Sequence, residues 1–575
     1  MLVCGMTNED FCNVLENIAR LLELKGENPF KIRAYSRASQ SLSLAPLNIA
    51  SATEEQLKEI EGVGDAIAEK MRELAQTGHL KFYEELRKEF PPDIFTLFQV
   101  PGLGAKKIKA LYQTLEVASV DALEKACRDG RLAALPGFGK KTSQKLLRAL
   151  EEMHRNSSKF LASWALPIAE KLLEDFKSLK AVTLASYAGS LRRGNEVVGD
   201  IDFIVAGKPA EDIISHFTAY PLVETVLAKG STKCSVILQG GIQCDLRVVT
   251  VSEYPFALVY FTGSKEHNVR LRGRALENGW SLNEYCFTAA RSLKKPLPQV
   301  NEEADVYSAL DLQWIPPELR EDRGELAAAA AGKIPHLVEL ANIRGTFHCH
   351  TTESDGKHTL QQMAEAAVEL GFEYLGIADH SKSSVQANGL TEERLLAQQK
   401  AIAKLNADST GFRLFAGTEC DIRKDGTLDF ADEILASLDY VVASIHSSFS
   451  LPEAEMTKRV IRALSHPHVT ILGHMTGRLL LTRSPYAIDV PAVIEAAAAT
   501  GTWIELNASP ERLDMEWRWW PMAREKGVKC VINPDAHSIR GFQNLYFGIR
   551  SARKGGLTRK DVMNCLSLSS IAEFL

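Results

Sequence analysis

Two carboxylates stand one residue apart inside an apolar run, Asp200-Ile201-Asp202-Phe203-Ile204-Val205, and this run leaves few choices of local structure. A β-strand places residues i and i+2 on the same face, so Asp200 and Asp202 would point together while Ile201 and Phe203 enter a core. Two close like charges repel each other unless a cation lies between them. The run therefore predicts a half-buried strand with a cation-binding pair on its open face. The alternative is a solvated strand edge with ordinary carboxylates.

The residues just upstream favour the cation-binding interpretation. The turn Gly189-Ser190-Leu191-Arg192-Arg193-Gly194 supplies backbone N–H groups and two guanidinium groups, which suit phosphate oxygens. Mg²⁺ is usually held by one or two carboxylates together with substrate phosphates. A third carboxylate, Asp245, lies in the second strand of a predicted hairpin formed by residues 235–238 and 242–249. Three carboxylates suit two metal ions and an in-line displacement at phosphorus, which is the chemistry of nucleotidyl transfer.

The chain as a whole has the size and composition of a multidomain globular protein. Its 575 residues exceed a single core, and at about 100–200 residues per domain they predict three to five domains. No apolar run of about 18 residues predicts a membrane span, and the short apolar start at residues 1–6 lacks the basic residues of a signal peptide. Ten scattered cysteines without a Cys-x-x-Cys pair favour reduced thiols in the cytoplasm. The net charge of −6 argues against an all-over basic nucleic-acid binder but permits local basic surfaces.

Three short repeats near the start share an apolar residue, a Gly-apolar-Gly triplet and a helix-forming run. The glycines of the three triplets are Gly62 and Gly64, Gly102 and Gly104, and Gly137 and Gly139. Glycines at a helix N-terminus allow a tight turn and expose N–H groups, which bind anions such as a DNA backbone phosphate. One triplet is as often a plain turn between helices. Three copies with the same flanks resemble helix-hairpin-helix motifs, which hold DNA without reading its sequence.

Aromatic and amide side chains follow the predicted hairpin. Tyr260 and Phe261 precede Gly263, and Asn268 and Arg272 come next. An aromatic pair before a glycine would place backbone against a sugar, where an added 2′-hydroxyl would clash. The alternative is that the two rings belong to a core.

With these motifs in order, residues 1 to about 315 resemble a family X DNA polymerase of the polymerase beta type. The motifs are Gly-Ser-x-Arg-Arg-Gly, Gly-Asp-x-Asp, Asp-x-Arg, Tyr-Phe-Thr-Gly-Ser and Asn-Glu-Tyr. The resemblance implies that Asp200, Asp202 and Asp245 are catalytic and hold two ions, either Mg²⁺ or Mn²⁺. It also implies that the nucleotide is contacted by Ser190, Arg193, Gly199, Tyr260, Phe261, Gly263, Asn268 and Arg272.

The helical start resembles the 5′-phosphate-binding, lyase-type domain of the same family. By that resemblance Lys31 and Tyr35 contact a DNA phosphate and Lys70 is the Schiff-base lysine. Ala66 stands where the family has a further phosphate-binding lysine. This departure predicts a weaker hold on the phosphate and leaves the deoxyribose-phosphate lyase activity of Lys70 open.

From residue 343 onward a different pattern recurs, in which an apolar strand ends in a residue suited to bind metal and a helix follows. These residues are His348, His350, Asp355, His380, Glu419, His446, His474, Asp535 and His537. Alternating strands and helices predict a β/α barrel, whose strand ends converge on one face. A lone histidine is more often a core or surface residue. Six histidines and three acids at successive strand ends instead predict a cluster of two or three ions.

Residues from about 342 to 575 resemble the PHP (polymerase and histidinol phosphatase) domain, and all nine ligand positions are filled. The resemblance therefore implies an active site that holds Mn²⁺, Zn²⁺ or both. Cys349, between two ligands, is interpreted as a small buried residue rather than a ligand. The cluster Trp517-Arg518-Trp519-Trp520 either stacks unpaired bases near the site or packs into a core.

The predicted fold is multidomain, with α+β and α/β parts. It combines helical N-terminal domains that carry helix-hairpin-helix motifs, a nucleotidyltransferase palm with a mixed sheet, a thumb, and a distorted (β/α)7-type barrel. The predicted domains are a 5′-phosphate-binding (lyase-type) domain at 1–90, a helix-hairpin-helix DNA-binding (fingers-type) domain at 91–155, the palm at 156–252, the thumb at 253–318, a linker with a helical piece at 319–341, and the PHP domain at 342–575.

Together the resemblances imply DNA-directed, gap-filling DNA synthesis in base excision repair or end processing, with 3′→5′ exonuclease activity in the second half. The family adds abasic-site endonuclease and 3′-phosphatase activities. We expect a monomer whose partners are gapped or primer-template DNA and deoxynucleoside triphosphates, with no membrane. One rival is a template-independent nucleotidyltransferase with an attached phosphatase, against which the three repeats and the Tyr260-Phe261 pair argue. Another is a DNA-binding scaffold without catalysis, against which the complete ligand sets argue.

Overall fold

A computed structural model describes residues 6–45, 47–100, 102–156, 158–290 and 296–575 of the chain. The chain divides into two compact units, Met1–Ser157 and Ser158–Leu575. The apolar start at residues 1–5 and Pro101 of the second glycine repeat lie outside the described residues. Within the part of the chain that is described, no helix is both long and apolar enough to cross a membrane.

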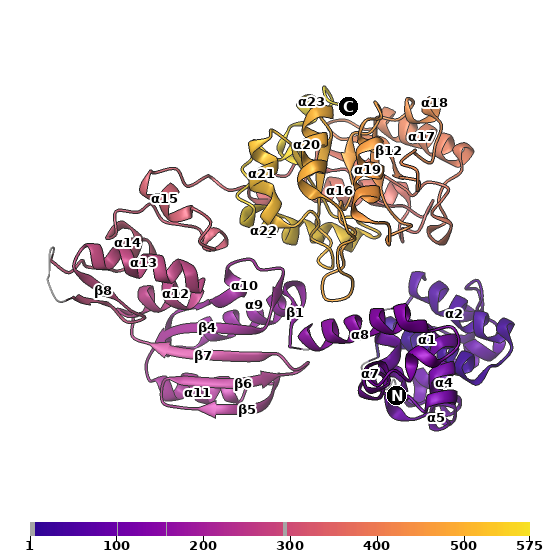
Figure 1. Ribbon diagram of the computed structural model, residues 1–575, viewed down its shortest axis with the longest axis horizontal. Coiled ribbons are helices and arrows are strands. Elements are labelled where there is room, and N and C mark those ends of the chain that lie inside the picture. The colour runs from indigo at the N-terminus through magenta and orange to yellow at the C-terminus, as the bar shows by residue number, and fades with distance from the viewer. Residues whose placement is uncertain (1–5, 46, 101, 157, 291–295) are drawn as a thin grey trace. The chain divides into compact units, whose positions relative to one another are not determined.

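The first unit consists of short helices around a continuous apolar core (Figure 1). Its helices are α1 (Asn8–Lys25), α2 (Pro29–Leu44), α3 (Glu54–Lys58), α4 (Asp65–Thr77), α5 (Lys81–Lys88), α6 (Ala105–Leu115), α7 (Val120–Arg128) and α8 (Gly139–Asn156), with 3₁₀ turns η1 (Pro92–Gln99) and η2 (Leu132–Ala134). In α1, Phe11, Leu15 and Ile18 recur at helical spacing and are buried. Thr7 caps the start of this helix, and Gly26 ends it in the left-handed region. Helix α1 is therefore amphipathic, with one face in the core of the first unit.

Each glycine repeat forms the turn that precedes a helix. The first glycines, Gly62, Gly102 and Gly137, have φ of +86°, +86° and +87°, a conformation that side chains with a Cβ rarely adopt. Gly64 and Gly104 are the N-caps of α4 and α6, and α8 begins at Gly139. The tight turn predicted from the sequence is therefore present in all three copies, and each leads directly into a helix.

The second unit begins with a five-stranded mixed sheet in the order β2-β4-β7-β6-β5 (Figure 1). Its strands are β2 (Val182–Tyr187), β4 (Asp200–Gly207), β5 (Val223–Lys229), β6 (Lys233–Leu238) and β7 (Gln243–Val249), with helices α9 (Ala162–Ser178), α10 (Gly189–Arg192) and α11 (Ala210–Thr218) and a small ribbon of β1 (Phe160–Leu161) and β3 (Val197–Val198). Strands β4 and β7 are parallel, and the remaining pairs are antiparallel. Ile201 and Phe203 are buried on β4 as predicted, and the hairpin of β6 and β7 is confirmed.

A smaller helical region follows the sheet and has its own apolar core. It contains α12 (Tyr254–Thr262), α13 (Lys265–Glu277), β8 (Trp280–Leu282), β9 (Phe287–Ala289), α14 (Glu303–Ser308), η3 (Pro317–Leu319) and α15 (Glu325–Ala330). Helix α15 is the helical piece expected within the linker. The same segment also buries Arg320, Ala329 and Ile334. Residues 319–341 are therefore packed against the preceding helices and are more than a spacer.

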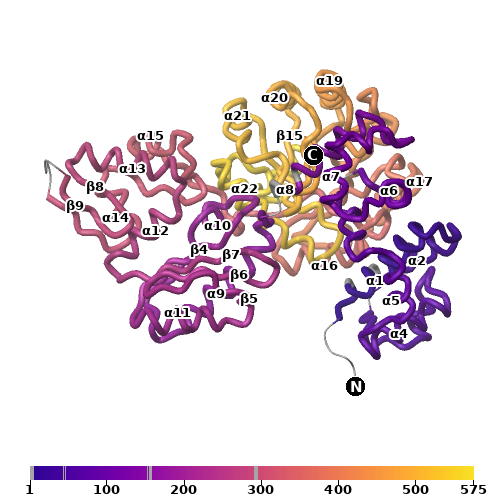
Figure 2. Tube along the Cα trace, turned by 60° about the horizontal axis from the view of Figure 1, so that its bottom comes forward, coloured from indigo at the N-terminus to yellow at the C-terminus, as the bar shows by residue number. Residues whose placement is uncertain are grey.

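The remainder of the second unit, drawn in orange to yellow in Figure 2, contains a parallel sheet of seven strands in sequential order, β10 to β16. The strands are β10 (Gly345–Thr346), β11 (Tyr374–Ile377), β12 (Arg413–Asp421), β13 (Tyr440–Ser444), β14 (Ile471–Leu472), β15 (Trp503–Asn507) and β16 (Cys530–Asn533). A parallel bridge between Cys349 and Ala536 joins the first segment to the last. The sheet is thus nearly closed, which confirms the predicted seven-stranded barrel.

Helices and short turns connect the barrel strands or lie before the first strand and after the last one. They are α16 (Leu360–Glu369), α17 (Glu392–Ala407), α18 (Asp432–Leu435), α19 (Glu453–Leu464), α20 (Val490–Thr500), α21 (Trp520–Glu525), α22 (Leu545–Lys554) and α23 (Leu568–Ile571), with 3₁₀ turns η4 (Leu340–Asn342), η5 (Val385–Ala387), η6 (Trp517–Trp519), η7 (Ile539–Asn544) and η8 (Met563–Cys565). The sheet and the helices share a large core that includes Ile504, Ile532 and Trp520. In parallel barrels the chain places functional residues at the strand ends, because the connecting loops there are free to vary.

Candidate active sites

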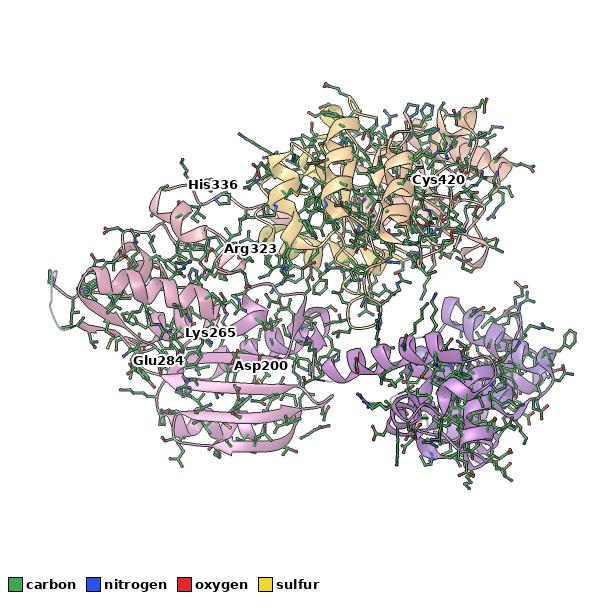
Figure 3. The ribbon with its side chains drawn as sticks, viewed as in Figure 1. Asp200, Lys265, Glu284, Arg323, His336 and Cys420 are labelled. Carbon is green, nitrogen blue, oxygen red and sulfur yellow. The ribbon has the colours of Figure 1, made fainter. Side chains whose placement is uncertain are left out.

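Three carboxylates meet on the mixed sheet of the second unit. Asp202 on β4 lies directly beside Asp245 on the parallel neighbour β7, and Asp200 is two residues earlier on the same strand (Figure 3). One oxygen of each carboxylate lies within 4.8 Å of the others. Oδ1 of Asp245 is buried without a hydrogen-bond partner, while Oδ2 accepts a hydrogen bond of 3.0 Å from Gln243. An unpartnered buried oxygen among like charges suits a divalent cation.

The raised pKa values of these carboxylates also favour a bound cation. Burial together with the charges of Asp200 and Asp245 raises the pKa of Asp202 to about 7. Burial and the charge of Asp245 also raise the pKa of Asp200. Without a cation, at least one of these groups therefore holds a proton near neutral pH, and a bound cation would displace it.

Replacing Asp202 with asparagine should stabilise the metal-free protein at alkaline pH. Because its folded pKa of about 7 lies above the ordinary aspartate pKa of 3.8, the folded state holds an extra proton, and the associated stability is lost as pH rises from about 4 to 7. At pH 8 the ionised carboxylate then costs up to about 4 kcal/mol, which asparagine removes. Thermal melting in a chelator should show the Asp202→Asn variant gaining Tm over the unmodified protein as pH rises from 5 to 8. The exposed Asp212→Asn variant is the control, and an equal gain in both variants would contradict the prediction.

The Gly-Ser turn packs directly against this carboxylate group. Gly189 begins α10 with φ of +60°, and a β-carbon there would collide with Oδ2 of Asp202. Nε of Arg193 donates a 3.0 Å hydrogen bond to Glu321, and its Nη1 donates one of 2.6 Å to the Thr262 carbonyl. Arg192 is instead held by Glu303, through hydrogen bonds of 2.7 and 2.9 Å. The turn therefore holds the predicted Ser190 and Arg193 next to the carboxylates. Arg192 instead forms an ion pair with Glu303 of the helical region that follows the sheet.

A Gly189→Ala change should abolish any activity of the carboxylate group, since the new methyl displaces Asp202. The Gly241→Ala variant is the matched control, because Gly241 has φ of +89° but open space around the added methyl. Both variants carry backbone strain of about 1–2 kcal/mol, and only the first moves a predicted ligand. Nucleotide incorporation assays should show a loss of at least about a hundredfold for Gly189→Ala and a change of less than about twofold for Gly241→Ala. Equal activity in the two variants would show that the contact with Asp202 does not matter.

Three of the five residues predicted to border the sugar, base and template line a small cavity between α12, α13 and β8. Tyr260, Asn268 and Arg272 line it, together with Leu282 and Asn283. The ring of Phe261 packs edge-on against Tyr260 at 5.1 Å between centroids, and the Arg247 guanidinium lies 4.5 Å from the Phe261 ring. Both rings are half-buried, so they are not simply core residues. Gly263 lies beside Arg193, and Gly199 is exposed just before Asp200.

In the first unit, the three residues assigned to phosphate binding and the Schiff base meet at one aromatic ring. Tyr35 stacks on Phe82 at 6.2 Å between centroids, and the ammonium groups of Lys31 and Lys70 lie 5.7 and 5.2 Å from that ring. Nζ of Lys70 also donates a 3.0 Å hydrogen bond to the carbonyl of Ala66. No local pattern distinguishes Phe82, because a phenylalanine in an amphipathic helix is ordinarily a core residue. Its ring brings the two lysines to one side of the unit.

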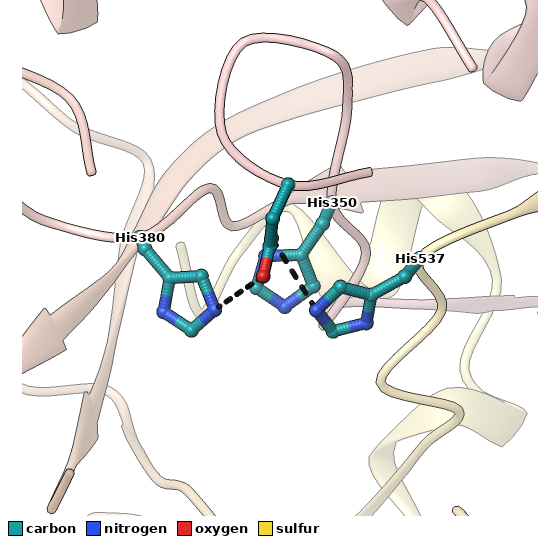
Figure 4. Close-up of side chains that lie close together, drawn as sticks. His350, His380 and His537 are labelled. Carbon is teal, nitrogen blue, oxygen red and sulfur yellow. Dashed lines mark ion pairs between the residues drawn. The ribbon is translucent and has the colours of Figure 1, made fainter. Parts of the chain in front are cut away.

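All nine predicted ligands of the barrel gather at the carboxyl ends of its strands. Three overlapping groups have ligand atoms close enough to share an ion: His350, Asp355, His380 and His537; His348, His350 and Asp535; and His380, Glu419 and His446. His474 lies outside these groups, but its Nε2 is 2.9 Å from Oε1 of Glu419. Figure 4 shows the imidazoles of His350, His380 and His537 turned toward one space. Three adjoining groups agree with the predicted two or three ions.

The donor atoms of this site fit metal ions. Several buried atoms make no hydrogen bond of acceptable geometry. They are Nε2 of His348, both ring nitrogens of His350, Nδ1 of His380, Oε2 of Glu419 and Nδ1 of His474, although the His380 and Glu419 atoms lie 2.9 Å apart. Such atoms cost free energy unless a ligand satisfies them. Burial and the neighbouring imidazoles of His537 and His380 lower the pKa of His350 to about 4, so its ring is neutral, as a metal ligand must be.

Pairs of acidic and imidazole side chains shift the pKa values of the barrel cluster. Burial opposes the proton on His446, but Glu419 and Asp421 outweigh it and raise the pKa to about 10. Burial likewise opposes ionisation of Asp355, but His537 and His350 lower its pKa to about 2. The neighbouring imidazoles therefore favour the ionised form of the carboxylates at neutral pH.

Two residues that orient ligands were missed by the sequence reasoning. Glu505 on β15 is fully buried and accepts a hydrogen bond of 2.7 Å from Nδ1 of His348 and one of 3.0 Å from the backbone of His474. Asp421 on β12 lies 2.9 Å from Nδ1 of His446. Carboxylates of this kind fix the ring orientation and tautomer of metal-binding histidines. The available signal was a charged residue inside the apolar run Trp503-Ile504-Glu505-Leu506.

The structure also decides two interpretations near this site. Cys349 is fully buried, and burial raises the pKa of its thiol well above the usual value, in agreement with a packing role. Trp517 and Trp520 are buried, with Trp520 in the barrel core. Trp520 therefore packs into the core, and Trp517 is buried against the cationic side chains of Arg323, Arg518 and Lys554, so neither ring is exposed for stacking on bases.

Family models match four segments of the chain in the predicted order. They are a helix-hairpin-helix domain at residues 6–80, a SAM-like helix-hairpin-helix tandem at 95–152, a DNA polymerase beta thumb at 257–321 and a PHP domain at 346–509. The DNA polymerase/3′-5′ exonuclease PolX of Bacillus subtilis (strain 168) is 39% identical over 573 residues, which is 99% of each chain. This chain belongs to the PolX family of DNA polymerases. Membership confirms the predicted pairing of a family X polymerase with a 3′→5′ exonuclease in one enzyme.

Relatives of the barrel alone are also found. A probable phosphatase of Thermoanaerobacter sp. (strain X514) is 28% identical over 239 residues, covering 40% of this chain and 92% of that protein. A probable phosphatase of Caldanaerobacter subterraneus subsp. tengcongensis is 30% identical over 202 residues, covering 33% of this chain and 74% of that protein. The helix-hairpin-helix and thumb domains make DNA a partner of the PolX chain, and both halves are of metal-dependent types.

Proposed function

We propose that this enzyme fills short gaps in DNA with its first half and trims 3′ ends with its barrel, in base excision repair or end processing. The observation that carries the proposal is the presence of two complete and separate ligand sets in one chain. One set is the carboxylate group of β4 and β7, and the other is the nine-residue cluster at the barrel strand ends. Abasic-site endonuclease and 3′-phosphatase activities belong to the second set.

In the proposed synthesis, Asp200, Asp202 and Asp245 hold two ions, either Mg²⁺ or Mn²⁺. Ions held by these carboxylates would supply positive charge that lowers the pKa of a primer 3′-hydroxyl and balances the triphosphate. Ser190 and Arg193 hold the triphosphate from the adjacent turn, and Gly199 approaches it. Tyr260, Phe261 and Gly263 exclude a 2′-hydroxyl from the sugar position, and Asn268 and Arg272 face the base and template.

In the proposed 3′ trimming, the nine barrel ligands hold two or three ions, Mn²⁺, Zn²⁺ or both, which supply a hydroxide nucleophile and a clamp on the phosphodiester. The chain's own contribution is to keep His350 neutral and to orient His348 and His446 through Glu505 and Asp421. The probable phosphatases that match the barrel favour phosphomonoester as well as phosphodiester cleavage at this site.

The first unit is proposed to hold DNA through the turns at Gly62 and Gly64, Gly102 and Gly104, and Gly137 and Gly139, with Lys31 and Tyr35 on the 5′-phosphate. The space around Gly102, Gly104 and Gly137 is open to an approaching backbone. Lys70 is the proposed Schiff-base lysine. Ala66 adds no cation beside it, which makes lyase activity the weakest part of this assignment. The boundaries at residues 90, 155, 252, 318 and 341 and the monomeric state remain predictions.

One incubation tests both halves. A gapped duplex with a 5′-labelled primer is incubated with the enzyme and Mg²⁺ or Mn²⁺, with and without deoxynucleoside triphosphates. Extension limited by the gap is expected with nucleotides, and shortening of the primer without them. Equal extension on a single-stranded primer would instead favour the template-independent transferase. An intact primer in all lanes would favour the DNA-binding scaffold.

A further inference from the structure

Within the second unit, helix α22 of the barrel half (residues 342–575) contacts the turn at residues 189–194, which lies in the polymerase half and is proposed to bind the nucleotide. Nη2 of Arg550 donates a 2.6 Å hydrogen bond to the carbonyl of Leu191, and Nζ of Lys554 donates one of 3.0 Å to the carbonyl of Arg193. These carbonyls lie at the C-terminal end of the short helix α10. Carbonyls at a helix end lack partners within the helix, and cationic side chains are favourable there. Two cations of the barrel half therefore fix the turn that carries Ser190 and Arg193.

Lys554 also belongs to a chain of side chains that ends at the Arg193 guanidinium. Oε1 of Glu321 accepts hydrogen bonds from Nζ of Lys554 at 2.6 Å and from Nε of Arg193 at 3.0 Å. The Lys554 side chain is 1% exposed, and its ammonium lies 4.7 Å from the ring of Trp517. Burial lowers the pKa of Lys554, and Glu321 only partly offsets this, leaving it at about 8. A buried cation is retained only where its partners are well placed.

Two further ion pairs join the barrel half to the polymerase half beside Lys554 and Glu321. Nη2 of Arg478, in the barrel half, donates a 2.7 Å hydrogen bond to the buried carboxylate of Glu196, which follows the turn. Nε of Arg553, one residue before Lys554, donates a 2.6 Å hydrogen bond to Glu318. Several buried ion pairs thus join the halves of the second unit, and of the cations named here only Lys554 shares a carboxylate with Arg193.

We infer that Lys554 is a positioning residue for nucleotide binding, because it holds Glu321 and the Arg193 backbone so that the guanidinium faces the triphosphate. The inference rests on the proposed role of Arg193. It makes the barrel a structural part of the polymerase site, although Lys554 itself touches neither nucleotide nor DNA in this arrangement. Removing the ammonium would free the Glu321 carboxylate and release the Arg193 carbonyl. The Arg193 guanidinium would then lose conformational freedom each time a nucleotide binds. This entropy cost weakens nucleotide binding, while the reacting groups stay unchanged.

Steady-state gap filling by the full-length enzyme tests this inference. Lys554→Met should raise the KM for the incoming nucleotide by about tenfold while kcat changes less than about twofold. Lys554→Arg keeps a cation and should keep KM within about threefold of the original value. Glu321→Gln should also raise KM, and the double variant should be no worse than the poorer single variant, since the two residues act as one unit.

Arg553→Ala is the matched control, because it loosens the same contact surface without touching Arg193, and its KM should stay within about twofold. Shortening of primers by each preparation reports whether the barrel is folded. An unchanged KM in Lys554→Met and Glu321→Gln would overturn the inference, as would an equal rise in Arg553→Ala. If Lys554→Met also lost shortening, Glu321→Gln alone decides, since it lies outside the barrel. Failure of the unmodified enzyme to extend any primer would instead refute the proposed function.

Discussion

Replacing Asp202 with alanine should lower the rate of nucleotide incorporation by at least about a thousandfold. The side chain is one of the three carboxylates that would hold the proposed ions, with Asp200 on its own strand and Asp245 on β7, so its removal would weaken ion binding. Primer shortening by the barrel should remain within about twofold of the unmodified rate, because none of its nine ligands lies on the mixed sheet. Single-turnover incorporation into a gapped duplex, with shortening measured on the same preparation, provides both rates.

The control for this change is Asp212→Ala, which removes an exposed carboxylate from α11 in the same half of the chain. Its incorporation rate should be that of the unmodified enzyme. Retention of near-normal incorporation by Asp202→Ala would mean that the carboxylate group is not the polymerase site. A simultaneous loss of shortening would mean that the variant is misfolded or that the two activities share one centre.

Glu419→Gln should produce the reverse pattern, with shortening reduced by at least about a thousandfold and incorporation unchanged. This carboxylate is central to the barrel site. Its Oε1 lies 2.9 Å from His474 and 3.2 Å from His446, and its Oε2 lies 2.9 Å from His380. Glutamine has nearly the same shape but no charge, so it cannot balance ions held by these imidazoles. Metal content measured after dialysis should fall together with the shortening rate.

Glu433→Gln on the exposed face of α18 is the matched substitution, and both activities should be unaffected by it. If Glu419→Gln shortened primers at the normal rate, the barrel site would be misassigned. Because Glu419 is buried and its imidazole neighbours hold its pKa well below the usual value, a folding defect is also tested by comparing thermal melting of the two variants.

Much of both sites was predictable because the relevant patterns are local. Alternation along β4 alone places Asp200 and Asp202 on one face, and pairing with β7 then brings in Asp245. The barrel ligands were predictable because parallel strands share an end, so residues far apart in sequence, such as His348 and His537, must approach one another once the barrel closes. One rule is sufficient for each prediction: the two-residue period of a strand for the carboxylates, and the shared end of parallel strands for the barrel residues.

The residues that were missed depend on contacts that no local pattern encodes. Glu505 is recognised as a positioning group only when His348 is seen beside it. Phe82 matters only because three other helical residues surround its ring. Lys554 is the last residue of α22, whose C-terminal turn is basic like that of many helices. Its position against Arg193 follows from the packing of two parts of the chain that were predicted as separate domains. Tertiary packing, rather than periodicity, selects such partners.

Closure of the barrel by the bridge from Cys349 to Ala536 also sets an order of events during synthesis on the ribosome. His348 and His350 emerge early in the second half, yet Asp535 and His537, which complete their ligand groups, emerge nearly 190 residues later. Domains made first generally fold first. A nascent chain therefore has the whole carboxylate group of β4 and β7 in place long before the barrel can retain its metals. The predicted metal site of the barrel can form only after β16 and the residues that follow it have been made.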